Sequence, residues 1–185
     1  MLIIIEGPDH SGKTTLHQSL KEIKGTHLAL LSTNERQSDP AKFFSYVKSI
    51  SSMAAITNVV TDRHPVISEL IYGPILRPNE EMIGDIGWSS PGIIKNLFGD
   101  PPIIIIYCKV SPSDTAFRRR FAKSYQLHGV KPNIELICRS YDELMLKIRQ
   151  SSGGLHVIEV DQFDPRQKTK EVICDLLNQS GERNG

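Results

Sequence analysis

The chain has 185 residues, a length that suits one globular domain with a full α/β core. Hydrophobic residues make up 39% and charged residues 23%, a balance that is typical of a soluble protein. The formal net charge of +1 excludes a strongly basic nucleic-acid coat but permits a local basic patch.

The three cysteines, Cys108, Cys138 and Cys174, are widely spaced and form no CxxC pair or Cys/His ligand pattern. The spacing indicates neither a disulfide framework nor a zinc site, so we expect reduced, structural thiols. The apolar residues 1–5 meet Glu6 at once, too soon for a signal sequence or a bilayer span. We therefore expect a cytoplasmic protein without a membrane partner.

Short apolar runs alternate with longer segments of helical period. In chain order we expect a strand at residues 2–6, a helix at 14–24, a strand at 27–31, a helix at 40–55, strands at 56–62 and 102–110, helices at 112–127 and 133–150, a strand at 155–160 and a helix at 165–179. The strands are rich in Ile and Val without alternation, which is typical of strands buried on both faces. The pattern predicts a single α/β domain over residues 1–185, with a five-stranded parallel sheet flanked by helices on both faces.

Capping residues followed by proline support several helix starts, because the missing N–H of a proline costs nothing at the first helical position. These pairs are Asp39-Pro40, Ser90-Pro91, Ser111-Pro112 and Asp164-Pro165. Residues 73–91 hold three prolines and three glycines with little periodicity, so we expect a loop there. The polar residues 180–185 are expected to fray.

Residues 7–14 match the phosphate-binding pattern G-x-x-x-x-G-K-S/T in full. The match follows an expected strand and opens an expected helix, where backbone N–H groups and the helix dipole favour a phosphate. Lys13 is expected to reach the β- and γ-phosphates of ATP, and the Thr14 hydroxyl to bind Mg²⁺. The expected ATP-binding residues are Gly7, His10, Ser11, Gly12, Lys13, Thr14 and Thr15.

A phosphate loop alone is compatible with a GTPase, an ATPase motor or a small kinase. The chain lacks the N-K-x-D segment with which GTPases read guanine. It also lacks the four apolar residues followed by Asp-Glu that are usual in ATPase motors. The third expected strand instead ends in Asp62-Arg63-His64, where ligands bind in parallel sheets. The sequence therefore favours a small kinase.

With these motifs, the chain resembles the thymidylate kinase and deoxynucleoside kinase group of P-loop kinases, especially short thymidylate-kinase-like proteins of bacteriophages. The matching segments are Glu6-Gly7-x-Asp9-x-x-Gly12-Lys13-Thr14-Thr15, Asp62-Arg63-His64 with Ser68 and Tyr72-Gly73, residues 103–112 with Arg118-Arg119-Arg120, and Arg139-x-Tyr141. The similarity spans most of the chain, and the phosphate loop is its most specific part.

The resemblance implies a role for each matching residue. Asp62 would organise Mg²⁺ or act as a base toward the acceptor, and Arg63 would hold the acceptor phosphate or the transferred one. Asp9 would touch the acceptor's sugar hydroxyl. The implied acceptor-side residues are Arg36, His64, Ser68, Tyr72, Arg77, Arg139 and Tyr141.

The resemblance also implies a lid at residues 115–132 and a homodimer. Arg118, Arg119 and Arg120 at the start of the lid would stabilise the transferring phosphoryl group. They, rather than His10, are the expected catalytic cations, because a histidine is only fractionally charged near neutral pH. At most two of the three can face the phosphates from one helix. The alternatives are a solvated helix face for these arginines, an ion pair for Asp62-Arg63, and packing roles for His64 and Tyr141.

Two departures from the resemblance fall on the acceptor side. The T-R-E-P-G-G-T segment of thymidylate kinases is replaced at residues 32–40, where Arg36 would be its only arginine. The spacing from Asp62 to Ser68 is one residue longer than in the family. A deoxynucleoside monophosphate such as dTMP is the expected acceptor. The alternatives are a deoxynucleoside and a nucleotide-gated binding module without catalysis.

Another alternative is phosphorylation of 5-hydroxymethyluracil within phage DNA, a step of DNA modification. Such an enzyme needs a carboxylate base, a basic face for the DNA backbone and a pocket for an extruded base. Asp62 or Asp9 would be the base. The basic face would use Arg118, Arg119, Arg120, Lys123 and Lys131.

Overall fold

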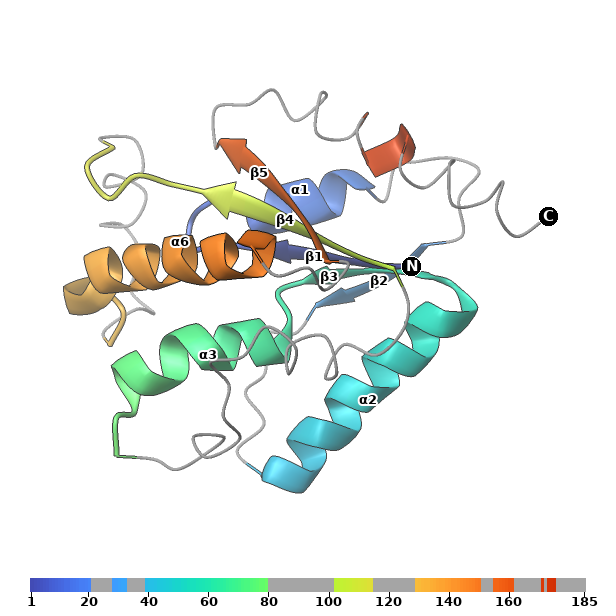
Figure 1. The fold of residues 1–185 in the computed structure, drawn as a ribbon, viewed down its shortest axis with the longest axis horizontal. Coiled ribbons are helices and arrows are strands. Elements are labelled where there is room, and N and C mark those ends of the chain that lie inside the picture. Colours follow the sequence, from blue (N-terminus) through green and yellow to red (C-terminus); the bar gives the residue numbers. More distant parts are fainter. Residues whose placement is uncertain are drawn as a thin grey trace.

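Five parallel strands form one sheet in the computed structural model, which describes residues 1–20, 28–32, 39–79, 102–114, 129–150, 155–161, 171 and 173–175 (Figure 1). The strands are β1 (Leu2–Glu6), β2 (Leu28–Ser32), β3 (Asn58–Asp62), β4 (Ile103–Lys109) and β5 (Leu155–Asp161). Their order is β2-β3-β1-β4-β5, so β1 lies at the centre. The expected five-stranded parallel sheet is confirmed.

Helices cover both faces of the sheet, as expected (Figure 1). Helix α1 (Lys13–Ser19) lies on one face, and α2 (Pro40–Ile56), α3 (Pro65–Leu76) and α6 (Ile134–Gln150) lie on the other. A short 3-10 turn at Lys131–Asn133 leads into α6. None of the described helices is both long enough and apolar enough to cross a bilayer.

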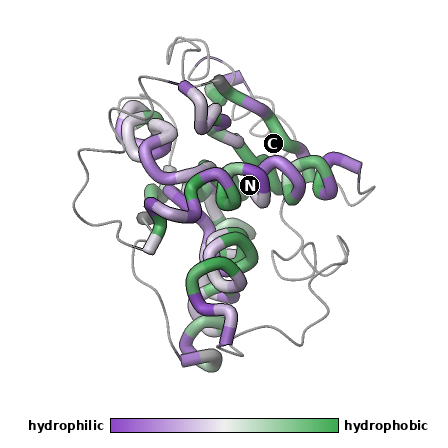
Figure 2. The backbone as a smooth tube through the Cα atoms, turned by 90° about the vertical axis from the view of Figure 1, so that its left-hand side faces the viewer, coloured by the Kyte–Doolittle hydropathy of each residue, from purple (hydrophilic) through white to green (hydrophobic). Residues whose placement is uncertain are grey.

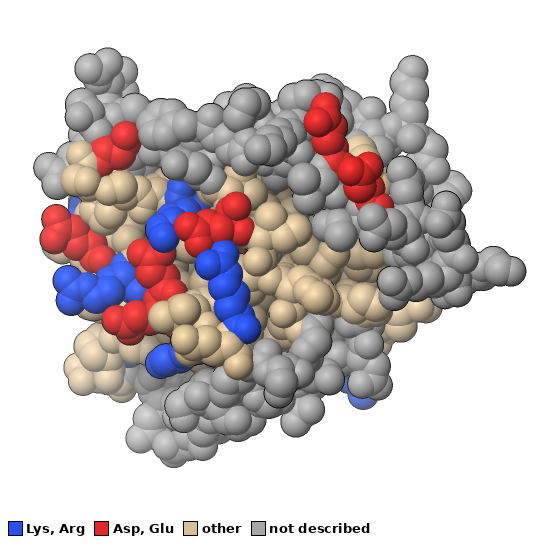
Figure 3. Space-filling model, turned by 45° about the horizontal axis from the view of Figure 1, so that its top comes forward, with Lys and Arg blue, Asp and Glu red and all other residues tan. Residues whose placement is uncertain are grey.

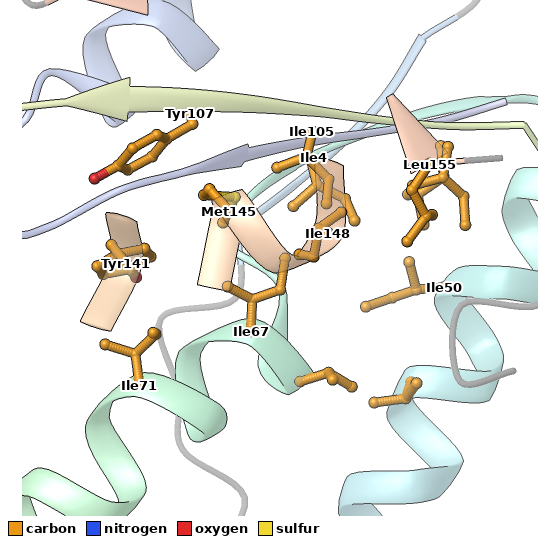
Figure 4. Packing of buried hydrophobic residues seen from close by; sticks show 14 of the residues in the cluster. Ile4, Ile50, Ile67, Ile71, Ile105, Tyr107, Tyr141, Met145, Ile148 and Leu155 are labelled. Atoms are coloured by element: carbon orange, nitrogen blue, oxygen red, sulfur yellow. The ribbon is translucent and has the colours of Figure 1, made fainter. Parts of the chain in front are cut away.

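The central strand explains why two helical layers are needed. Ile3 and Ile5 of β1 pack with Leu16 of α1, whereas Leu2 and Ile4 face the larger core between the sheet and the other three helices. Figure 4 shows this larger core, and Figure 2 shows apolar and polar stretches alternating along the helices. Full burial of one such side chain contributes about 1.5–3 kcal/mol, so a strand buried on both faces requires cover on both.

Helix α3 is the main difference from the sequence-based expectations, which contain no helix between residues 62 and 73. The expectation of a loop from residue 73 is wrong for residues 73–76, which belong to α3. The helix begins after His64 with Pro65 at its first position, and Ile67 and Ile71 anchor it in the core. Pro74 lies inside its last turn, where a single missing N–H is tolerated because tertiary packing holds the helix.

Other boundaries differ from the expectations by a few residues. Helix α2 extends to Ile56, so β3 begins at Asn58 instead of residue 56. The cap before α2 is confirmed, since an Asp39 carboxylate oxygen accepts from the Ala41 N–H at 2.9 Å.

Several expected segments lie outside the described residues: the loop beyond residue 79, most of the lid and the tail. Of the last expected helix, only residues 171 and 173–175 are described, and they are helical. The three cysteines are free.

Candidate active site

The phosphate loop and the Asp62–His64 segment meet where β1 and β3 end side by side. Ile5 of β1 lies in register with Asp62 of β3. The pairing extends one residue further, because the Arg63 N–H donates to the Ile5 carbonyl at 2.9 Å. The carboxyl edge of the sheet therefore brings together two motifs that are about fifty residues apart in the sequence.

The phosphate loop has a backbone that requires glycine at its two ends. Gly7 has φ 147° and Gly12 has φ 91°, values that side chains with a Cβ rarely adopt. A Cβ on Gly7 would lie 2.4 Å from the Cys108 carbonyl oxygen of β4. Gly12 precedes the first residue of α1, so the loop ends directly at a helix N-terminus.

Replacing Gly7 by alanine is expected to destabilise the protein by about 2 kcal/mol or more, because the new methyl group meets backbone and the φ value is strained. Thermal unfolding of the variant measures this loss. Gly12→Ala is the matched control: its φ is strained as well, but its Cβ would meet nothing within 4 Å. A smaller loss for Gly7→Ala than for Gly12→Ala would contradict the described packing of the loop on β4.

Lys13 is held inside the phosphate loop. Its side chain is buried, and its Nζ donates to the Pro8 carbonyl at 2.5 Å and to the Ser11 hydroxyl at 3.3 Å. Burial, together with the nearby Arg63, lowers the pKa of Lys13 to about 8. Lys13 donates these hydrogen bonds to neutral oxygens, and burial outweighs the attraction of nearby acids such as Asp9, so an anion bound in the loop would stabilise the ammonium.

Thr14 and Asp62 join the loop to β3. The Thr14 hydroxyl donates to an Asp62 carboxylate oxygen at 2.7 Å, and Asp62 is 2% exposed. A hydroxyl and a carboxylate are the hard oxygen ligands that suit Mg²⁺. Within the described ranges, no three His, Cys, Asp or Glu residues gather into a metal-binding group. These two residues therefore fit a Mg²⁺ site only of the kind that phosphate oxygens and water complete.

Arg63, the next residue, contacts a different group of side chains at the same edge. Its Nη2 contacts an Asp9 oxygen at 2.5 Å, and its Nη1 donates to the Tyr141 hydroxyl at 3.2 Å. The Tyr72 hydroxyl donates to the second Asp9 oxygen at 3.0 Å, and the Tyr72 ring lies 5.2 Å from the Arg63 guanidinium carbon. The structure thus brings together four residues predicted for the acceptor side, from the phosphate loop, β3, α3 and α6.

Comparisons with sequences leave the family open. No family model matches the chain. A serine hydroxymethyltransferase of Malacoplasma penetrans is 28% identical over 122 residues, which are 66% of this chain. The chain spans only 28% of the length of that protein, so the likeness is partial and its activity is not carried over.

Comparisons with solved structures cover nearly the whole chain. The YorR protein of Bacillus subtilis, in complex with phosphorylated GDP, has a TM-score of 0.69 at 22% identity over 98% of both chains. Deoxyadenosine kinase from M. mycoides, with the products dCMP and dCDP bound, has a TM-score of 0.57 at 16% identity over 97% of this chain and 99% of that one. Thymidylate kinase from Candida albicans has a TM-score of 0.55 at 12% identity over 97% and 92%. The chain has a P-loop kinase fold.

Two further acceptor-side candidates of this P-loop kinase fold have structural partners. His64 is fully buried at the start of α3, where its Nδ1 accepts from the Val66 N–H at 3.3 Å. Burial lowers the pKa of His64 to about 3, so it stays neutral and caps the helix. Arg77 donates to both carboxylate oxygens of Glu69 at 2.7 Å. Roles of His64 and Arg77 in acceptor binding stay predictions.

The remaining candidates are scattered or not described. Ser68 lies one turn before Tyr72 on α3, and its buried hydroxyl has no hydrogen-bond partner among the described residues. Arg139 is exposed on α6, away from the buried Tyr141 two residues later. Arg36, Arg118 and Arg119 lie outside the described residues, so their roles stay predictions. Sequence reasoning assigned no role to Glu6, although an acid that ends a buried strand directly before a phosphate loop is a usable signal.

Proposed function

We propose that the protein is a P-loop kinase that transfers the γ-phosphate of ATP to a nucleotide-type acceptor. One observation carries this proposal. Asp62 and Arg63 are neighbours in sequence, yet Asp62 contacts Thr14 at the helix end of the phosphate loop, whereas Arg63 contacts Asp9 near the start of the same loop. A phosphate donor bound near Thr14 and an acceptor bound near Asp9 would both lie next to the end of β3, within reach of each other for phosphoryl transfer.

On the donor side, the backbone N–H groups of the phosphate loop and the Lys13 ammonium would bind the β- and γ-phosphates. Lys13 would exchange neutral oxygen partners for charged ones. Thr14 and Asp62 would hold Mg²⁺, which neutralises developing negative charge on the phosphate when bound. Arg118 and Arg119 of the expected lid are proposed to add positive charge during transfer.

On the acceptor side, Asp9 is the accessible acid, with a side chain 24% exposed. It would accept a hydrogen bond from a sugar hydroxyl of the acceptor. Arg63 would bind an acceptor phosphate, and the hydroxyl groups of Tyr72 and Tyr141 would hold the guanidinium in place. A cation and a hydrogen-bond acceptor side by side suit a deoxynucleoside monophosphate, and we propose dTMP.

A second candidate acceptor is a neutral hydroxyl, as in 5-hydroxymethyluracil within DNA or in a deoxynucleoside. The observation that favours it is the charge balance, because the Asp9 carboxylate already pairs with Arg63. A dianionic acceptor phosphate would then need positive charge from elsewhere, whereas a hydroxyl would not. Among the described residues on the face shown in Figure 3, acidic and basic side chains are interspersed.

A panel of acceptors tests these proposals. The protein is incubated with γ-labelled ATP and Mg²⁺ and with dTMP, the other deoxynucleoside monophosphates, deoxynucleosides or duplex DNA containing 5-hydroxymethyluracil. Label in dTMP is the expected result. Label only in DNA or only in a nucleoside would replace dTMP by the second candidate. Sedimentation of the same preparation checks the proposed homodimer.

A further inference from the structure

Glu6 is a fully buried acid at the end of β1, directly before the phosphate loop. Its two carboxylate oxygens bind different parts of the chain. Oε1 accepts from the His64 N–H at 2.5 Å, and Oε2 accepts from the Tyr141 hydroxyl at 3.0 Å. A buried carboxylate is costly unless it is hydrogen-bonded, and both oxygens here act as acceptors, as in an ionised group.

The first of these bonds fixes the backbone around Arg63. Arg63 has φ 70°, a left-handed conformation that is unfavourable for a residue with a Cβ. The Arg63 N–H donates to Ile5, and the next N–H, that of His64, donates to Glu6. Residues 5 and 6 of β1 therefore hold both ends of the turn that aims the Arg63 side chain at the acceptor side.

The second bond fixes the Arg63 guanidinium. The Tyr141 hydroxyl gives its hydrogen to Glu6 and receives one from Arg63 Nη1 at 3.2 Å. Tyr141 is fully buried, with its ring stacked on Tyr107 at 6.0 Å between centroids (Figure 4). Its ring is edge-on to that of Tyr72, at 6.2 Å between centroids. The hydroxyl therefore has a fixed position, and its orientation is set by Glu6.

Two acids thus act on Arg63, Asp9 by direct contact and Glu6 through Tyr141, and they differ in access to solvent. Asp9 is partly exposed, so an incoming acceptor can draw it away from Arg63. Glu6 is 0% exposed and cannot contact an acceptor directly. When Asp9 turns to the acceptor, the bonds of Glu6 to the His64 N–H and to the Tyr141 hydroxyl remain and keep Arg63 in place.

We propose that Glu6 is a positioning residue, which acts through His64 N–H and Tyr141 to hold Arg63 in its acceptor-binding position. This inference rests on the proposed function for the role of Arg63 in turnover. It goes beyond that function by linking the strand that carries the phosphate loop to the cation on the acceptor side. The competing interpretation is that Glu6 only stabilises the fold.

The test is a double-mutant cycle with Glu6→Gln and Arg63→Ala, read as separate KM values for ATP and for the acceptor. Glutamine keeps the size and one oxygen for His64 N–H, but its amide end donates to the Tyr141 hydroxyl instead of accepting from it. We expect the acceptor KM to rise about tenfold, with the ATP KM within about twofold of the wild-type value. In the Arg63→Ala background, Glu6→Gln should have no further effect.

Two results would overturn the inference: an equal rise in both KM values, or the same tenfold loss with and without Arg63. If Glu6→Gln does not fold, Tyr141→Phe replaces it in the cycle and is judged by the same criteria, since it removes the hydroxyl between Glu6 and Arg63. Glu159→Gln is the matched control, because Glu159 pairs with Lys109 and Arg149 on the surface. It should change neither KM.

An independent readout separates this inference from the proposed function. Side-chain NMR of ¹⁵N-arginine protein, with Arg63 assigned from the spectrum of Arg63→Lys, reports how firmly the guanidinium is held. We expect a slowly exchanging Arg63 signal in the wild type that is broadened or lost in Glu6→Gln and kept in Glu159→Gln. An unchanged signal in Glu6→Gln would overturn the inference even if the kinase is active. A wild type that labels no acceptor would refute the proposed function, and the NMR result would still decide the role of Glu6.

Discussion

Replacing Lys13 by alanine is expected to reduce phosphoryl transfer on the order of 10²–10³-fold, because the transferring phosphate loses a pre-positioned cation. The fold should persist. Burial lowers the pKa of Lys13 to about 8, which means that the buried charge is itself unfavourable in the protein without a ligand. Single-turnover kinetics with saturating ATP measures the rate, and thermal unfolding measures the stability.

Lys48→Ala is the matched control, because Lys48 is exposed on α2 and belongs to neither side of the proposed site. It should leave the transfer rate unchanged. Turnover of Lys13→Ala at the wild-type rate would show that the phosphate loop takes no part in the reaction. A collapse of the Lys13→Ala fold would contradict the claim that Lys13 is kept for binding and not for stability.

Replacing Asp62 by alanine is expected to lower phosphoryl transfer by a similar factor, on the order of 10²-fold or more. Asp62 is the described acid that contacts Thr14, so its loss removes one proposed ligand of Mg²⁺ and the partner of the other. The variant should need a higher Mg²⁺ concentration for half-maximal rate. Titration of the rate with Mg²⁺, for the wild type and the variant, measures both effects.

Asp39→Ala separates a catalytic acid from a structural one. Asp39 caps α2 through the Ala41 and Lys42 N–H groups, so its loss should cost about 1 kcal/mol of stability without changing the rate. An Asp62→Ala variant that loses stability like Asp39→Ala but retains its rate and Mg²⁺ dependence would show that Asp62 is only a structural partner of Thr14.

Local patterns in the sequence predicted the sheet and placed the phosphate loop between the first strand and the first helix. The strands of the core are continuous apolar runs, and the phosphate loop is a contiguous motif whose conformation depends on Gly7 and Gly12. The position of Asp62 follows from these, because β3 runs parallel to β1 in a register that ends both strands together. Such features depend on residues close in sequence or on the regular pairing of neighbouring strands.

The missed features depend on contacts between distant segments. Helix α3 was missed in part because the prolines and glycines from residue 73 onward, Pro74 among them, indicate a loop, whereas packing of Ile67 and Ile71 in the core stabilises the helix. The Arg63 contact with Tyr141 spans 78 residues, and that of Glu6 with Tyr141 spans 135. No periodicity or spacing encodes which hydroxyl lies between an acid and an arginine, so the role of Glu6 emerged only from the fold.

The central claim is that ATP and a nucleotide-type acceptor react at the edge where β1 and β3 end. Its most direct test is transfer of label from γ-labelled ATP to a pooled set of acceptors by the wild type, beside ATP binding measured by calorimetry on the same preparation. We predict stoichiometric ATP binding and label in an acceptor. ATP binding with no labelled acceptor in the pool would contradict the claim and leave a nucleotide-gated binding protein instead.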